Sequence, residues 1–234
     1  MDFHEGELIY INKPYGMTSF GALAYVRTRL SKALHVKRLK TGHAGTLDPL
    51  ATGVLILCTG RATKRIESLQ QSTKEYTATL QLGATTASYD REHTVNRTYP
   101  TRHINRQIIE QVLKGFVGEI QQVPPEYSAC NIGGDRAYKL ARKGEKVELK
   151  AKTLRIDEIE LTDFNASTMQ MTIRVVCGKG TYIRALARDI GEALHSGAFL
   201  TALCRTRVGD VSIDDCLTLE QFPQWLEREL GVRN

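Results

Sequence analysis

Two stretches of this chain, 76–82 and 169–175, alternate between apolar and polar side chains with a period of two. Such a period places every second side chain on the same face of a β-strand, so each stretch predicts a strand with one buried face. Elsewhere apolar residues recur at helical spacing, as they do over 18–34. Strands interleaved with helices predict an α+β fold, with a central mixed or antiparallel sheet flanked by helices, rather than a doubly wound sheet or a helical bundle.

The remaining elements follow from apolar runs, caps and breakers. We expect strands at 7–11, 54–58, 117–123 and within 200–213, and helices from 18 or 19, at 62–70, 107–114 and 135–143, from 181, and at 217–230. The segment 83–106 has no apolar periodicity and exceeds the usual loop length, which is typical of a binding loop. No repeat or linker divides the chain, so we expect a single domain over 1–234.

The net charge of +6 suggests a polyanionic partner only weakly, whereas the distribution of the charge is more informative. The basic residues form three groups: Arg27, Arg29, Lys32, Lys37, Arg38 and Lys40; Arg61, Lys64 and Arg65; and several residues of 136–152. A solvated helix face is an alternative explanation for any one group. Because two groups flank the glycine-rich segment 42–53, phosphates near that segment are the better explanation.

Several classes of protein and site are not supported. No apolar run approaches the roughly 18 residues of a membrane span, and the N-terminus lacks the pattern of a secretory signal, so we expect a cytoplasmic protein. Histidine and cysteine show no metal-ligand spacing, and we expect no metal. Phosphate-loop, dinucleotide-binding and nucleophile-elbow spacings are missing as well.

Asp48 lies in the glycine-rich segment, between Gly45 and Gly53 and directly before Pro49. Glycine permits backbone conformations closed to other residues, and proline restricts the residue before it to extended geometry. This combination fixes the direction of the aspartate, as a reactive carboxylate requires. A turn whose aspartate caps the following element explains the local sequence equally well.

Asp48, Tyr76 and Arg184 together form a possible catalytic set. A neighbouring arginine favours an ionised carboxylate, which is the nucleophilic form, and a tyrosine offers a stacking face and a hydroxyl for proton transfer. Taken separately, the three residues are explained as a cap, a core aromatic and a surface charge. Their spacing in the sequence does not show that they meet.

Several blocks of the chain, in order, resemble the TruB family of tRNA pseudouridine synthases. The segment 42–60, GHAGTLDPLATGVLILCTG, is similar to the catalytic motif of the family, and 13–19, KPYGMTS, to its N-terminal element. Further blocks are KEY at 74–76, PPEYSA at 124–129 with RAYKLAR at 136–142, GTYIRALARD at 180–189, and RTRVG at 205–209. The resemblance spans nearly the whole chain.

The resemblance implies a pseudouridine synthase catalytic fold and the roles of its site residues. Asp48 is then the nucleophile, Tyr76 stacks on the target base, and Arg184 pairs with Asp48. Substrate-binding roles fall to His43 against the refolded RNA loop, to Tyr182 and Leu200 in the uracil pocket, and to Lys13 beneath the site. Leu200 as plain core and His43 as a loop histidine remain alternatives.

The implied reaction is isomerisation of uridine to pseudouridine at position 55 in the T loop of tRNA, by a monomer without a cofactor. The segment 83–106 is our candidate RNA-binding insertion. Two departures from the family pattern stand out: Asn131 replaces a lysine, and the sequence ends without the C-terminal PUA domain common in the family, so we expect a short enzyme. The alternatives are a tRNA-folding chaperone without essential catalysis, and a synthase acting on another RNA.

Overall fold

The computed structural model describes residues 1–127, 131–132, 135–136 and 149–231, and its chain forms two compact units. The first unit comprises Met1–Tyr76 and Cys204–Asn234, and the second comprises Thr77–Leu203. Strands β4 (Lys74–Leu82) and β12 (Ala198–Val208) have residues in both units. That the whole chain acts as one domain stays a prediction.

The first unit is built on strand β3 (Thr52–Thr59), which is buried almost throughout. Strands β1 (Leu8–Lys13) and β2 (Thr41–Ala44) pair with β3 antiparallel, whereas β12 pairs with it in parallel, so the sheet is mixed. The other elements of this unit are α1 (Ser19–Ala33), the 3₁₀ helix η1 (Gly60–Arg65), α2 (Ile66–Gln71), β13 (Val211–Ser212), the 3₁₀ helix η2 (Ile213–Asp215) and α6 (Phe222–Glu229).

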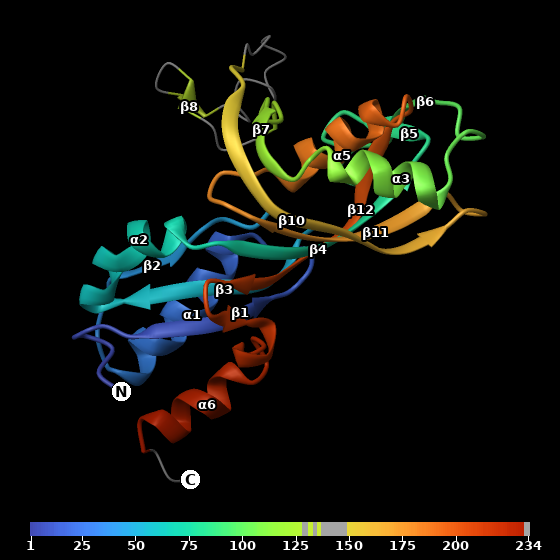
Figure 1. Ribbon diagram of the computed structural model, residues 1–234. Coiled ribbons are helices and arrows are strands. Elements are labelled where there is room, and N and C mark those ends of the chain that lie inside the picture. Colours follow the sequence, from blue (N-terminus) through green and yellow to red (C-terminus); the bar gives the residue numbers. More distant parts are fainter. Residues whose placement is uncertain (128–130, 133–134, 137–148, 232–234) are drawn as a thin grey trace. The chain divides into compact units, whose positions relative to one another are not determined.

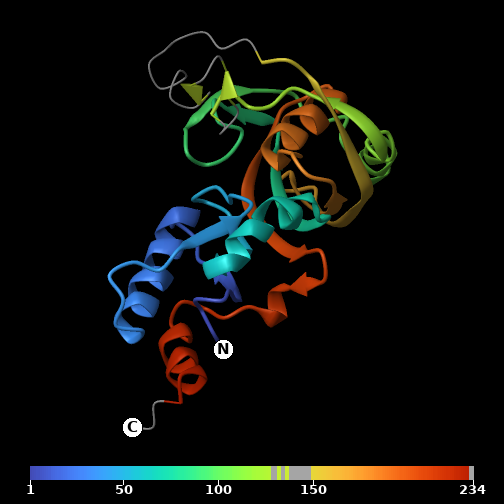
Figure 2. The same cartoon turned by 90° about the vertical axis from the view of Figure 1, so that its left-hand side faces the viewer.

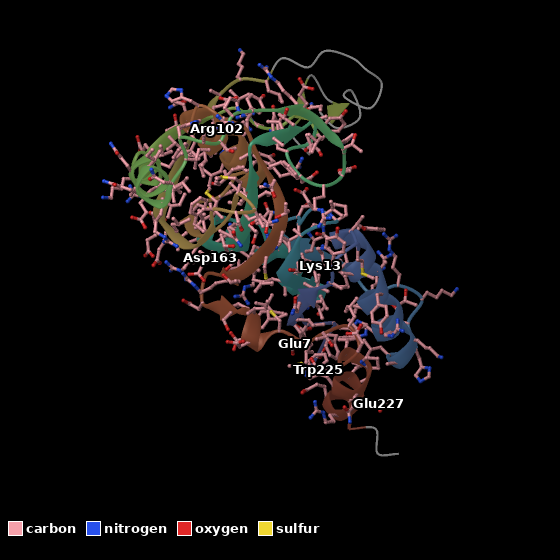
Figure 3. All side chains as sticks on the ribbon, turned by 90° about the vertical axis from the view of Figure 1, so that its right-hand side faces the viewer. Glu7, Lys13, Arg102, Asp163, Trp225 and Glu227 are labelled. Carbon is pink, nitrogen blue, oxygen red and sulfur yellow. The ribbon has the colours of Figure 1, made fainter. Side chains whose placement is uncertain are left out.

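Both faces of β3 are covered, because its side chains alternate between two apolar clusters. On one face, Leu55 and Leu57 pack with the buried sides of α1 and α6; on the other, Val54 and Ile56 pack against α2 (Figure 1). Trp225 of α6, labelled in Figure 3, packs at the edge of the first cluster. A continuous apolar run is what a strand covered on both faces requires.

In the second unit, strands β12, β4, β11 (Gln170–Cys177), β10 (Lys152–Asn165) and β7 (Gly118–Gln122) are neighbours in that order in a sheet. Helix α3 (Arg106–Lys114) packs near β10 and α5 (Ile183–Ala193), as can be followed in Figure 2. The elements of this unit not yet bounded are β5 (Ala84–Thr86), β6 (Val95–Thr98), β8 (Asn131–Ile132) and β9 (Asp135–Arg136).

Most elements expected from periodicity are confirmed. In β4 and β11 the residues on one face, including Ala78, Leu80, Ile173 and Val175, are buried. Helix α1 begins at Ser19, and the expected cap is present because the Thr18 side chain accepts a hydrogen bond from the Gly21 N–H at 2.9 Å. The α+β class is therefore confirmed. Within the described residues, no helix has the length and apolar character needed to cross a bilayer.

Several expected elements differ from those observed. The segment 83–106 is not one loop, since β5 and β6 pair as a short antiparallel hairpin. The helix expected at 62–70 starts as a 3₁₀ turn, and the helix expected at 217–230 begins only at Phe222. At 135–143, Asp135–Arg136 is a strand rather than the start of a helix, and the remainder lies outside the described residues. Strand β10 was not expected at all.

Candidate active site

Asp48 lies in the first unit, on an irregular segment between β2 and β3, and is partly exposed. The chain leaves β2 at Gly45 with φ of +94°, a conformation that strongly favours glycine. Past Asp48 the chain turns at Pro49, and the Ala51 N–H donates to the main-chain oxygen of Asp48 at 3.0 Å. The element that follows is a strand, so the aspartate does not precede a helix.

Two buried side chains from the start of the chain hold this segment. Ser19 Oγ exchanges hydrogen bonds with the Leu47 main chain, accepting from its N–H at 2.8 Å and donating to its carbonyl oxygen at 3.0 Å. Lys13, labelled in Figure 3, is fully buried, and its ammonium donates to the carbonyl oxygens of Pro14, Met17 and Pro49 at 2.9, 2.6 and 3.3 Å. Lys13 thus ties the turn after β1 to the Asp48 segment, and its role in a substrate site stays a prediction.

Arg205 contributes a further buried cation that the sequence analysis did not assign to the site. Its side chain is 2% exposed, with Nε donating to Val54 O at 2.8 Å and Nη2 to Gly45 O at 3.0 Å. These two carbonyls lie on either side of Asp48 in the sequence. The guanidinium therefore ties both ends of the Asp48 segment to strand β12. The arginine in the 205–209 block was the available signal.

These cations also act electrostatically on their neighbours. Burial lowers the pKa of Lys13 to about 8, the negative charge of Asp48 opposes this shift, and the positive charge of Arg205 adds to it. Burial, and secondarily Arg205, also lowers the pKa of His43, which favours the neutral imidazole. The buried Nδ1 of His43 has no hydrogen-bond partner among the described residues. The positive charges of Lys13 and Arg205 thus lie close to the Asp48 segment.

Tyr76 is the last residue of the first unit and lies in β4, with only 8% of its surface exposed. Its neighbour Glu75 points to the opposite face of the strand, where it accepts a hydrogen bond from Thr206 Oγ1 at 2.8 Å and pairs with Arg207 at 3.4 Å. These contacts join β4 to β12 on the face of the strand opposite to the tyrosine.

Arg184 lies in the second unit, in the first turn of α5, and is 5% exposed, so it is not a surface charge. Its guanidinium donates to Ser88 O at 3.2 Å and Tyr127 O at 2.9 Å, and its Nε lies 3.7 Å from Asp90 Oδ2. Asp90 is itself buried, and its Oδ1 accepts from the Ser88 hydroxyl and from the Glu92 N–H. The pairing of Arg184 with Asp48 stays a prediction, because the two residues belong to different units.

The hairpin segment therefore supplies residues around Arg184, a role that the sequence did not reveal. Tyr89 has φ of +58°, and its carbonyl accepts the Leu200 N–H at 2.9 Å. Tyr182 precedes α5, and its N–H donates to Gln122 Oε1 at 2.9 Å. Leu200 is 3% exposed. In the sequence, Asp90 is one acidic residue within a long polar segment, and nothing else there indicates that it lies beside Arg184.

The structure thus gathers the predicted residues in two groups. Asp48, Lys13, His43 and Tyr76 belong to the first unit, where Arg205 joins them. Arg184, Tyr182 and Leu200 belong to the second unit, where Asp90 joins them. The first group combines a carboxylate with two buried cations, and the second combines a buried arginine with a buried leucine and a partly buried tyrosine.

Comparison with known proteins accounts for nearly the entire chain. Residues 31–183 match the TruB family pseudouridylate synthase N-terminal domain, and residues 184–231 match the tRNA pseudouridylate synthase B C-terminal domain. Proteins named tRNA pseudouridine synthase B from Phocaeicola vulgatus and Bacteroides fragilis are each 62% identical over 229 residues, which cover 98% of this chain and 97% of those proteins. The protein of that name from Flavobacterium johnsoniae is 44% identical over 97% of the chain.

Solved structures agree with the fold. A Cbf5–Nop10–Gar1 complex contains a chain that matches 99% of this one with a TM-score of 0.72 and 29% identity. An H/ACA RNP bound to a substrate RNA containing 2′-deoxyuridine gives a TM-score of 0.68 and 28% identity over 99% of this chain. This chain spans only 58% and 57% of those two chains.

The α+β fold with a mixed sheet is that of the pseudouridine synthases. Because the family match covers well over half of the residues and the named relatives reach 62% identity, the chain belongs to the TruB family of pseudouridylate synthases.

Proposed function

We propose that this protein isomerises uridine to pseudouridine in tRNA, at position 55 of the T loop, with Asp48 as the nucleophile. The observation that carries the proposal is the Asp48 segment, which Ser19, Lys13 and Arg205 hold through five hydrogen bonds. Relatives named tRNA pseudouridine synthase B, at 62% identity, support tRNA as the substrate. A main chain held on both sides of Asp48 limits the positions open to its carboxylate, so less reorganisation is needed when it reacts.

The reaction requires a bond exchange at the anomeric carbon. The bond from C1′ to uracil N1 breaks, the uracil turns within the site, and a bond from C1′ to C5 forms, after which C5 loses its proton and N1 gains one. The product is an isomer, so no oxidant or reductant is consumed. Attack of Asp48 on the sugar, attack on the base, and removal of a sugar proton are three possible first steps, and each uses the ionised carboxylate.

The other predicted residues have complementary roles in the proposal. A uridine inside a folded loop must leave its stack, which costs a few kcal/mol. The ring of Tyr76 offsets part of this cost by stacking on the extruded base, and Tyr182 and Leu200 enclose it. Arg184, which its three contacts hold in one orientation, is the charge partner of Asp48.

The decisive experiment incubates the protein with an unmodified T-arm transcript and maps pseudouridine in the product. We expect product at position 55 with the wild-type protein and none with Asp48→Asn. Asp210→Asn, at an exposed turn of the same unit, is the matched control and retains activity. No product from the wild-type protein, or equal product from Asp48→Asn, contradicts the proposal.

A further inference from the structure

The chain from Leu8 to Leu47 contains no aspartate or glutamate but carries seven lysines and arginines. Lys13 is buried beneath the Asp48 segment, while the others lie partly or fully at the surface of α1 and of the segment that follows it. A surface of one charge sign attracts a polyanion and repels basic partners. This stretch of the first unit therefore fits nucleic acid better than a protein surface of mixed charge.

Two aromatic side chains project from the same stretch. Tyr15 in the turn after β1 is 60% exposed, and Phe20 in the first turn of α1 is 61% exposed. Among the described large apolar and aromatic side chains these two are the most exposed. The guanidinium carbon of Arg27 lies 5.7 Å from the centre of the Phe20 ring. A single exposed aromatic is ordinary, but two of them beside a cation in an acid-free stretch match the composition of a base-stacking surface.

The turn that carries these rings is fastened to the Asp48 segment. The Gly16 N–H, next to Tyr15, donates to Pro49 O at 2.9 Å. Ser19, next to Phe20, is the residue whose hydroxyl holds Leu47 on the other side of Asp48. Tyr15 is thus next to a residue that is hydrogen-bonded to Pro49, and Phe20 is next to one that is hydrogen-bonded to Leu47. Pro49 and Leu47 directly flank Asp48. The two rings therefore lie on segments that are bonded directly to the Asp48 segment.

We propose that Tyr15 and Phe20 form a platform on which unpaired bases of the RNA substrate stack beside the target uridine, with Arg27 neutralising a nearby phosphate. The platform rests on the proposed function for the identity of that RNA and for its target uridine. Stacking tolerates any base because every base presents a π-face, so the platform contributes affinity and does not read sequence. It compensates for the loop structure that is lost when the uridine is extruded.

The test measures the affinity of T-arm RNA for the Asp48→Asn protein by fluorescence anisotropy at fixed salt. We expect Tyr15→Ala combined with Phe20→Ala to raise Kd by about tenfold or more, and Tyr15→Phe to leave it within about twofold, because the ring is retained. Val117→Ala removes an apolar side chain of similar exposure, 50%, from the second unit and serves as the matched control. Both rings are exposed, so an unchanged melting temperature accompanies the loss of affinity.

A second measurement separates the rings from the charge. Arg27→Gln reduces the dependence of log affinity on log salt by about 0.7, the value for one phosphate of a single strand, whereas Phe20→Leu weakens binding without changing this slope. A double alanine variant that binds within twofold of its parent overturns the platform. Binding is read without turnover, so a wild-type protein that binds RNA through these rings but forms no pseudouridine contradicts the proposed function alone.

Discussion

Replacing Arg205 with methionine is the most direct test of how the Asp48 segment is held. Methionine fills much of the same volume but donates no hydrogen bond, so Gly45 O and Val54 O lose the donors now at 3.0 and 2.8 Å. An unsatisfied buried carbonyl costs about 1–3 kcal/mol, which gives about 2–6 kcal/mol for the two. Removing a buried charge returns part of this cost, and we expect a net loss of about 2–4 kcal/mol in the free energy of unfolding.

The same change should slow the reaction more than it weakens binding. Once Gly45 is released, Asp48 is no longer fixed, and a misplacement of about 1 Å in a reacting group costs about a hundredfold in rate. We therefore expect kcat for pseudouridine formation to fall by about that factor, with KM for the T-arm transcript within about threefold of wild type. Urea unfolding and single-turnover kinetics measure the two effects separately.

Arg207 provides the control within the same strand. It is 37% exposed and pairs with Glu75 at 3.4 Å, so Arg207→Met should cost less than about 1 kcal/mol and leave kcat nearly unchanged. If Arg205→Met keeps wild-type kcat and its free energy of unfolding stays within about 0.5 kcal/mol of wild type, the two carbonyl contacts do not position Asp48.

Three further predictions concern other contacts of the two groups. Gly45→Ala and Gly53→Ala both place a side chain at positive φ. The added Cβ meets only a guanidinium nitrogen at 3.5 Å at position 45, but a backbone oxygen at 2.2 Å at position 53. Gly53→Ala should therefore lower the free energy of unfolding by at least about 2 kcal/mol more than Gly45→Ala does. The pKa of Lys13 is about 8 in the folded chain, below its ordinary 10.5, so between these two pH values the unfolded chain binds more protons than the folded chain. As pH rises through this window, the free energy of unfolding of wild type should therefore increase by up to about 3 kcal/mol relative to that of Lys13→Met. Asp90→Asn removes the charge beside Arg184 and should lower unfolding free energy by about 1–3 kcal/mol and kcat by at least tenfold, as denaturation and single-turnover assays will measure.

Each of these predictions has a matched comparison. Equal melting temperatures for the two glycine variants would show that the backbone approach at Gly53 relaxes without cost. For Lys13, the exposed Lys64→Met should show no such gain in the alkaline range, and a flat difference between wild type and Lys13→Met refutes the assigned pKa. For Asp90, the comparison is the exposed Asp163→Asn on β10, labelled in Figure 3, which should behave as wild type.

Elements with an uninterrupted period were predictable from the sequence, and those with a shifted period were not. β4 and β11 keep one parity throughout, so their buried faces were evident. In β10 the register shifts between Ile156 and Glu158 and again between Leu161 and Asp163. Each bulge adds one residue, so the odd- and even-numbered side chains exchange faces of the sheet at that point. The apolar residues of this long strand therefore show no regular alternation.

Candidate site residues could be chosen from the sequence where a residue type carries its own chemical meaning, and their roles stay predictions. Asp48 stood out because of its glycine and proline context, and Tyr76 because of its position at the head of a strand. Arg205 did not stand out, because one buried and one exposed arginine two positions apart in a strand look alike in sequence. Asp90 was missed because its segment has no period and the residues around Arg184 come from distant parts of the chain.

The first unit is discontinuous, since Met1–Tyr76 is completed only by Cys204–Asn234. During synthesis the Asp48 segment emerges early, but the arginine that ties its two ends together emerges about 160 residues later. Contacts of such long sequence separation form late and slow folding, because a long loop must close first. A nascent chain therefore presents its basic stretch well before its carboxylate is fixed, and ribosome-bound fragments ending before Arg205 should bind RNA without modifying it.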